Sequence, residues 1–145
     1  YRVTGVDISE SGIRKARLLT GKYHIPAELV CASIENYLPA QPFHIFFCDN
    51  MLHLVTPGNR KQLLLTCKEL TPPGGIHVIN VPVQKPFLPQ GGEIQKCYPW
   101  FSGELFSLYW DWEILEGGEV RSHSETTPKS SEICSYIVAK KPISA

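Results

Sequence analysis

The sequence has no long hydrophobic run, and no stretch approaches the roughly 20 apolar residues that a membrane-spanning helix needs. It also shows no secretory signal peptide. Charge of one sign is not in excess, because 14 Lys and Arg balance 14 Asp and Glu, so no overall field would attract nucleic acid or an anionic membrane. These absences argue against a membrane protein and a nucleic-acid-binding protein, and they make the cytoplasm the expected location.

The five cysteines lack the spacing of a zinc site or of a disulfide framework. Their number is odd, no two form a C-x-x-C pair, and no histidine cluster accompanies them. This pattern is typical of free thiols in a reducing compartment. No metal site is therefore predicted. The cysteines are Cys31, Cys48, Cys67, Cys97 and Cys134.

The composition is that of a folded protein, because 43% of the residues are apolar and 19% are charged. At 145 residues the chain is long enough to bury a core as one domain. Apolar strands alternate with helices, which predicts a parallel sheet covered by helices on both faces. Expected strands are 3–7, 27–32, 43–48 and 76–81, and expected helices begin at Ser9 and at Thr56 with Pro57.

The helix after Ser9 is predicted from an apolar stripe at near-helical spacing. The stripe consists of Ile13, Ala16, Leu19 and Tyr23. In the second half of the chain, 82–101 is expected to be a long loop and 102–109 a short helix. Residues 112–116 and 133–139 are expected to form an antiparallel strand pair at the sheet edge, joined by a polar, mobile segment over 117–131.

Asp7 is the leading candidate for a binding residue, because it ends the first expected strand. In open α/β sheets ligands bind beyond the carboxyl ends of the strands, and an acid there accepts the hydroxyls of a nucleotide ribose. The Gly-rich turn of such folds lies about 20 residues before this acid, which here is upstream of Tyr1. We therefore expect the chain to lack the first strand and its Gly-rich loop, and the absence of an initial Met agrees.

Four segments, in order, resemble motifs of class I S-adenosylmethionine-dependent methyltransferases. Residues 3–9 resemble the second motif, 43–54 the fourth-strand motif, and 70–75 the L-k-P-G-G turn before the fifth strand. Residues 103–115 resemble the tellurite-resistance (TehB-type) branch, in which a G-E-L helix precedes a W-e-i-l strand. The resemblance runs from the family's second strand to the end of the chain.

The sequence departs from the family's pattern at three points. The Gly-rich motif for the methionine part of the cofactor lies outside the chain, which puts cofactor binding by this chain alone in doubt. Ser33 stands where many members carry an acid that binds the adenine amino group, although a hydroxyl also accepts a hydrogen bond. His44 replaces an Asp of the fourth-strand motif.

The resemblance implies an α/β protein with a Rossmann-like sheet, mostly parallel with a C-terminal antiparallel strand pair and N-terminally truncated. It implies one methyltransferase-like domain over 1–145, with 82–101 as a loop on the acceptor side. The implied cofactor is S-adenosylmethionine and the implied acceptor is a small molecule or an oxyanion. A sulfonium is an activated methyl donor, so placement of the acceptor suffices and no catalytic residue is predicted.

The family's cofactor contacts fall on residues at three strand ends. Asp7 would bind the ribose, Ile8 and the pair Ser33 and Ile34 would contact adenine, and the next strand end would face the methyl group or its acceptor. The ordinary alternatives are a surface or capping acid, a core isoleucine and a turn serine. A nucleophilic role is not expected for Cys48, because the sequence shows no His partner or positive neighbour to lower its thiol pKa. The predicted cofactor-binding residues are Asp7, Ile8, Ser33, Ile34, Cys48 and Asp49.

Further residues are weaker candidates on the acceptor side. His53 would serve as a base or simply pack, and Asn80 would contact the acceptor or satisfy loop backbone. Tyr98, Trp100 and Phe101 would form a lid or pack within the loop.

Two other functions compete with methyl transfer. An NAD(P)-dependent oxidoreductase shares the strand-end acid, but no Tyr-x-x-x-Lys pair follows it. A degenerate, non-catalytic binding module is the second alternative. Without a middle strand, its neighbours would pair directly or leave open edges, so marginal stability or self-association is expected.

Overall fold

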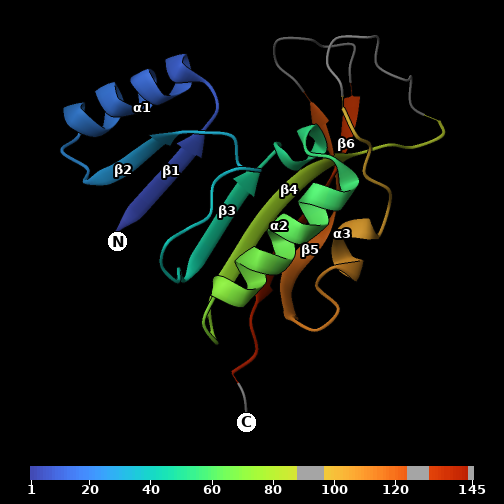
Figure 1. The fold of residues 1–145 in the computed structure, drawn as a ribbon. Helices are drawn as coiled ribbons and strands as arrows, with labels where there is room; N and C mark the ends of the chain where they lie inside the picture. Colours follow the sequence, from blue (N-terminus) through green and yellow to red (C-terminus); the bar gives the residue numbers. More distant parts are fainter. Residues whose placement is uncertain (88–96, 124–130, 144–145) are drawn as a thin grey trace. The chain divides into compact units, whose positions relative to one another are not determined.

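The computed structural model describes residues 1–87, 97–123 and 131–143, and the chain divides into two compact units (Figure 1). Unit 1 comprises Tyr1–Ala40 and unit 2 comprises Gln41–Ala145. Both units combine helix and strand, as the alternation of apolar segments predicts. No helix among the described residues is both long and apolar enough to cross a membrane.

Unit 1 is a strand–helix–strand unit made of β1 (Val3–Asp7), α1 (Glu10–Lys22) and β2 (Ala27–Cys31). The two strands pair in parallel along their whole length. Ser9 caps α1 as predicted, because its hydroxyl oxygen accepts a hydrogen bond from the Gly12 N–H at 3.1 Å. The cap fixes the turn that follows the carboxyl end of β1.

The apolar stripe of α1 is only partly buried. Ile13 is buried, but Leu19 and Tyr23 are exposed. The physical reason is the width of the sheet beneath the helix, since unit 1 offers only two strands. A two-stranded sheet covers less of a 13-residue helix than the spacing of its apolar residues would allow.

Unit 2 contains a four-stranded sheet in the order β3-β4-β6-β5. The β3–β4 pair is parallel, whereas β6 runs antiparallel to both of its neighbours, so the predicted terminal antiparallel pair is confirmed. Its elements are β3 (Ile45–Asp49), η1 (Leu52–Leu54), α2 (Pro57–Leu70), β4 (Ile76–Val83), α3 (Glu104–Ser107), β5 (Glu113–His123) and β6 (Ser131–Lys140).

The core of unit 2 lies on one face of this sheet. Alternate residues of β4, from His77 to Val83, are buried on it. Thr71 at the end of α2 and Tyr109 just after α3 both contact His77, so both helices cover the same face. Within unit 2, α2 and α3 thus lie on the same face of the sheet, whereas α1 belongs to unit 1. On the opposite face, Phe47 is 70% exposed.

The strands near the end of the chain are longer than predicted. β5 continues to His123, so part of the segment expected to be polar and mobile is strand; 124–130 lies outside the described residues. Pairing with β6 extends the strand through Gly117, where an added Cβ would lie 2.8 Å from the Phe106 ring. The predicted helix over 102–109 shortens to α3, which follows Gly103 in a left-handed conformation (φ 81°).

β1 and β3 are terminal strands of two different sheets. β1 pairs with β2, and β3 pairs with β4. We expected the neighbours of an absent strand either to pair directly or to leave open edges, and among the described residues β1 and β3 do not pair with each other. Each of the two strands keeps one edge that no described strand covers.

Candidate functional site

Asp7 is the last residue of β1, and its exposed carboxylate is held by the start of α1. Its Oδ1 accepts a hydrogen bond from the Ser9 N–H at 2.8 Å. Its Oδ2 points toward Gly12, where an added Cβ would lie only 2.9 Å away. The carboxylate thus has a fixed orientation, and the residue beneath it has no side chain to crowd it.

The strand ends of unit 1 bring four predicted site residues together. Asp7 stands opposite Cys31, and the Ala32 N–H donates to the Asp7 carbonyl at 3.0 Å, so the two chains stay adjacent beyond the strands. Ile8 is 74% exposed, which overturns the alternative that it belongs to the core. Ser33 accepts from the Glu35 N–H at 3.3 Å, the turn role that was its alternative, and Ile34 is half-buried.

The other two predicted residues, Cys48 and Asp49, end β3 in unit 2. Burial and the nearby Cys67 raise the pKa of the Cys48 thiol to about 12, so it is a neutral thiol at neutral pH. Asp49 is exposed and accepts from the Asn80 side-chain N–H at 2.8 Å. It does not cap η1, whose first turn has no side-chain cap.

The acceptor-side aromatic residues have different environments. Trp100 is fully buried, Tyr98 is half-buried and Phe101 is exposed. Tyr98 donates its N–H to the His53 carbonyl of η1 at 2.7 Å. The predicted loop lies partly outside the described residues, at 88–96. The structure therefore assigns Trp100 to the core.

Sequence reasoning missed Arg60, which is 3% exposed although its side chain is charged. The signal was present, because Arg60 precedes Leu63 and Leu64 by three and four residues on the apolar face of α2. A cation on an apolar helix face indicates a buried partner. Its partners, described below, lie in residues 98–104.

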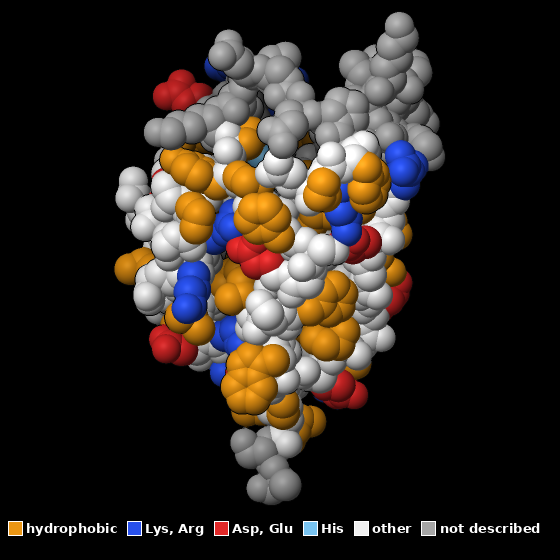
Figure 2. Space-filling view, turned by 90° about the vertical axis from the view of Figure 1, so that its right-hand side faces the viewer, with side chains coloured by type: hydrophobic (Ala, Val, Ile, Leu, Met, Phe, Trp, Pro, Cys, Tyr) orange, Lys and Arg blue, Asp and Glu red, His pale blue; other side chains and the backbone are white. Residues whose placement is uncertain are grey.

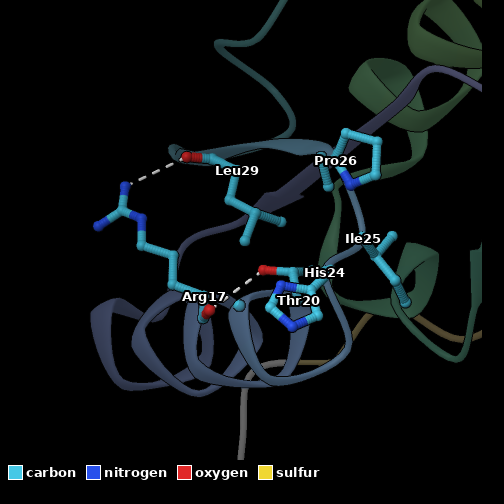
Figure 3. A pocket seen from close by; sticks show the side chains of 8 residues that line it. Arg17, Thr20, His24, Ile25, Pro26 and Leu29 are labelled. Atoms are coloured by element: carbon cyan, nitrogen blue, oxygen red, sulfur yellow. Dashed lines mark hydrogen bonds between the residues drawn. The ribbon is translucent and has the colours of Figure 1, made fainter.

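The hollow shown in Figure 3 is not at the strand ends that carry Asp7. It lies where α1 meets the start of β2, lined by Arg17, Thr20, His24 and Leu29 among others. Arg17 donates to the Leu29 carbonyl at 3.2 Å and so covers part of the β2 backbone. The hollow is therefore away from the carboxyl ends of the strands, where ligands of open α/β sheets bind.

Two further features of the described residues are their metal-ligating side chains and their surface charge. No group of three or more His, Cys, Asp or Glu among the described residues is arranged to hold a metal ion. On the face seen from the side of α3 and β5, basic and acidic side chains are interspersed (Figure 2). None of the five cysteines, all of which are described, forms a disulfide bond.

Comparison with known proteins supports the family resemblance. A family model described as a methyltransferase domain matches residues 1–75. Among solved structures, TehB from Haemophilus influenzae superposes with a TM-score of 0.82 at 19% identity, over 97% of this chain and 50% of that one. No curated protein matches the sequence.

Two further solved structures are similar. The N-methyltransferase NodS from Bradyrhizobium japonicum, in complex with S-adenosyl-l-homocysteine, gives a TM-score of 0.74 at 15% identity, over 98% of this chain and 67% of that one. The 1,6-didemethyltoxoflavin-N1-methyltransferase of Burkholderia thailandensis gives 0.75 at 19% identity, over 99% and 62%.

These likenesses concern the fold, and the chain spans half the length of the TehB chain that it matches. Because the family model covers more than half of its residues, the chain belongs to the methyltransferase domain family and has the Rossmann-like fold of class I methyltransferases.

Proposed function

We propose that this protein transfers a methyl group from S-adenosylmethionine to a small molecule. The observation that carries the proposal is the oriented carboxylate of Asp7 at the end of β1, with Gly12 beneath it and the exposed Ile8 beside it. Family membership supplies the reaction class, and the strand-end acid supplies a binding residue for its cofactor.

The residues at the ends of β1 and β2 fit the adenosine part of this cofactor. A carboxylate only accepts hydrogen bonds, and a ribose diol offers two donors on one edge. Ile8 presents an exposed apolar side chain next to that acid, which suits one face of an adenine ring. The Ser33 hydroxyl, already used by the turn, retains the capacity for a further hydrogen bond with the base.

S-adenosylmethionine, when bound, supplies a methyl group on a sulfonium, which needs little further activation. The protein's task is to orient the acceptor and exclude water. At the end of β3, the Asn80 amide fixes the Asp49 carboxylate, and Cys48 remains a neutral thiol. We propose that the residues at this end of β3 contact the acceptor.

The charge of Asp49 favours one of the two acceptor classes considered. An exposed carboxylate repels an oxyanion and accepts hydrogen bonds from N–H or O–H groups. We therefore favour a neutral or cationic small molecule with such donors over an oxyanion. The free thiols fit a reducing compartment, and the cytoplasm is the proposed location.

The test is calorimetric titration of S-adenosylhomocysteine into the wild-type chain and into Asp7→Ala. Glu10→Gln is the matched control, because Glu10 is another exposed acid in the first turn of α1. Micromolar binding that Asp7→Ala abolishes and Glu10→Gln retains is the expected result. Equal binding by both variants would show that Asp7 is not the ribose ligand.

If the wild-type chain does not bind, the titration is repeated on a chain extended upstream by about 50 residues, enough for a strand, loop and helix. Binding there assigns the missing affinity to the upstream segment. No binding by either chain contradicts the proposed function and favours a non-catalytic binding module.

A further inference from the structure

Arg60 is buried in unit 2 and directs its side chain to a single segment, Tyr98–Glu104, which we call the strap. Its Nη1 donates to the Tyr98 carbonyl and its Nη2 to the Pro99 carbonyl, both at 3.1 Å. Nη2 also lies 2.6 Å from Oε1 of Glu104. Planar guanidinium groups suit such multiple acceptors, which Lys cannot engage in the same geometry.

The guanidinium also packs on an aromatic ring of the strap. The Cζ of Arg60 lies 4.1 Å from the centre of the Trp100 ring, and Trp100 is fully buried. The other carboxylate oxygen of Glu104, Oε2, accepts a hydrogen bond from the Phe101 N–H at 3.0 Å. One cation thus fixes both ends of the strap and its middle.

The strap is in turn attached to the elements that carry the acceptor-side residues. Trp100 pairs with Val83 at the end of β4, and its carbonyl accepts from the Gln84 N–H at 2.8 Å. The Tyr98 N–H donates to His53 of η1 at 2.7 Å. The strap is therefore hydrogen-bonded both to the segment that follows β4 and to η1, which follows Asp49.

We propose that Arg60 is a positioning residue for the acceptor side of the site. It holds the strap against η1 and the end of β4, and so sets the shape of the surface on which the acceptor is placed. This inference rests on the proposed methyl transfer. We therefore expect substitution of Arg60 to weaken binding of the acceptor and to leave cofactor binding by Asp7 and Ile8 unchanged.

The test compares Arg60→Met and Arg60→Lys with Lys68→Met as a matched control. Lys68 lies on the same helix and is also paired, but it contacts Asp111 and the Leu108 carbonyl rather than the strap. Hydrogen exchange of the full chain is followed at the Gln84, Tyr98 and Phe101 amides.

Arg60→Met is expected to accelerate exchange at these three amides by roughly tenfold or more. In the wild type the strap can open only if the Arg60 contacts break, and in the variant these contacts are absent. The amides of Ile79 and Ile137 in the core strands should keep their wild-type rates. Arg60→Lys should restore part of the protection, since it keeps the cation. Unchanged strap exchange in Arg60→Met overturns the inference, as does equal acceleration throughout unit 2 or at the strap in Lys68→Met.

A kinetic measurement separates positioning from a merely structural role. Turnover of S-adenosylmethionine is measured with two acceptor probes: 1,6-didemethyltoxoflavin, and sodium selenite as an example of the disfavoured oxyanion class. With a probe that is turned over, Arg60→Met should raise the KM for that probe several-fold and leave the S-adenosylhomocysteine Kd unchanged. An equal loss of both affinities overturns the positioning role. Absence of both turnover and cofactor affinity in this chain and in the chain extended upstream contradicts the proposed function, while the exchange result still decides whether Arg60 anchors the strap.

Discussion

Gly12 of α1 lies directly beneath the carboxylate of Asp7, so that a Cβ at position 12 would be 2.9 Å from Oδ2. The clash would fall on the end of a side chain, which can rotate away. Gly12→Ala should therefore displace the Asp7 carboxylate while the helix itself is retained. We expect S-adenosylhomocysteine affinity to fall at least tenfold, measured by calorimetry, equivalent to about 1.4 kcal/mol or more.

Gly21→Ala is the control for this substitution. Gly21 lies in the same helix, and nothing comes within 4 Å of a Cβ built there. Both changes replace glycine by a better helix former, which favours the helix by about 0.5–1 kcal/mol. If the two variants bind the ligand equally well, the space above Gly12 has no role in orienting Asp7.

The second prediction concerns the buried His77, whose two ring nitrogens are both engaged. The Thr71 hydroxyl donates to the Cys67 carbonyl at 2.7 Å, so its oxygen accepts from His77 Nε2–H at 2.8 Å. His77 Nδ1 then accepts from the Tyr109 hydroxyl at 2.6 Å. The network thus fixes one neutral tautomer.

Tyr109→Phe removes the only hydroxyl that this arrangement assigns to Nδ1 and leaves a buried acceptor unpaired. We expect a loss of about 1–3 kcal/mol in the free energy of unfolding, measured by denaturant titration. Tyr136→Phe is the matched control, since its hydroxyl makes a longer 3.3 Å contact with Glu116 at the surface. Equal losses in the two variants would contradict the importance of the His77 network.

The same histidine predicts how stability depends on pH. Burial, with Lys68 and Lys141 nearby, lowers the pKa of His77 from 6.5 to about 3. Between these values the unfolded chain binds a proton that the folded chain does not. Its contribution to stability is therefore complete above about pH 6.5 and is lost as the pH falls toward 3.

Lowering the pH from 6.5 to 5 should reduce the free energy of unfolding by about 2 kcal/mol through His77 alone. The measurement is denaturant unfolding at both pH values for the wild type and His77→Gln. Because the other histidines are common to both proteins, the difference between them isolates His77. A pH dependence that survives the substitution unchanged would assign the effect to other groups.

The sequence alone was sufficient where the structure depends on local chemistry. The hydroxyls of Ser9 and Thr56 cap helices, and each accepts a hydrogen bond from the N–H group three residues later. Asp7 could be placed at a strand end for the same reason, because an acid between an apolar strand and a helix cap marks that boundary. Family motifs then gave it a candidate role.

Features that depend on distant partners could not be predicted. β5 continues beyond residue 117 because β6 pairs with it, although glycines 117 and 118 disfavour a strand. Arg60 is buried because its partners lie 38–44 residues later. The α1 stripe looked like a core face because sequence spacing does not reveal how wide the opposing sheet is.

The last prediction concerns self-association through the open strand edges. The outer edge of β2 is partly covered, since Arg17 donates to the Leu29 carbonyl. β3 has an edge that no described strand pairs, and Phe47 in its middle is 70% exposed. Apolar, unpaired strands of this kind favour pairing between chains.

We expect the wild-type chain to show a sedimentation coefficient that rises with concentration, and Phe47→Lys to abolish that rise, because a charged side chain on an edge strand opposes pairing. Phe87→Lys is the control, since Phe87 is equally exposed at 69% but lies outside the strands. An association that Phe87→Lys suppresses as strongly would assign it to general hydrophobicity. A monomeric wild type with a sharp, concentration-independent melting transition above about 60 °C would instead show that the open edge of β3 is tolerated without a partner.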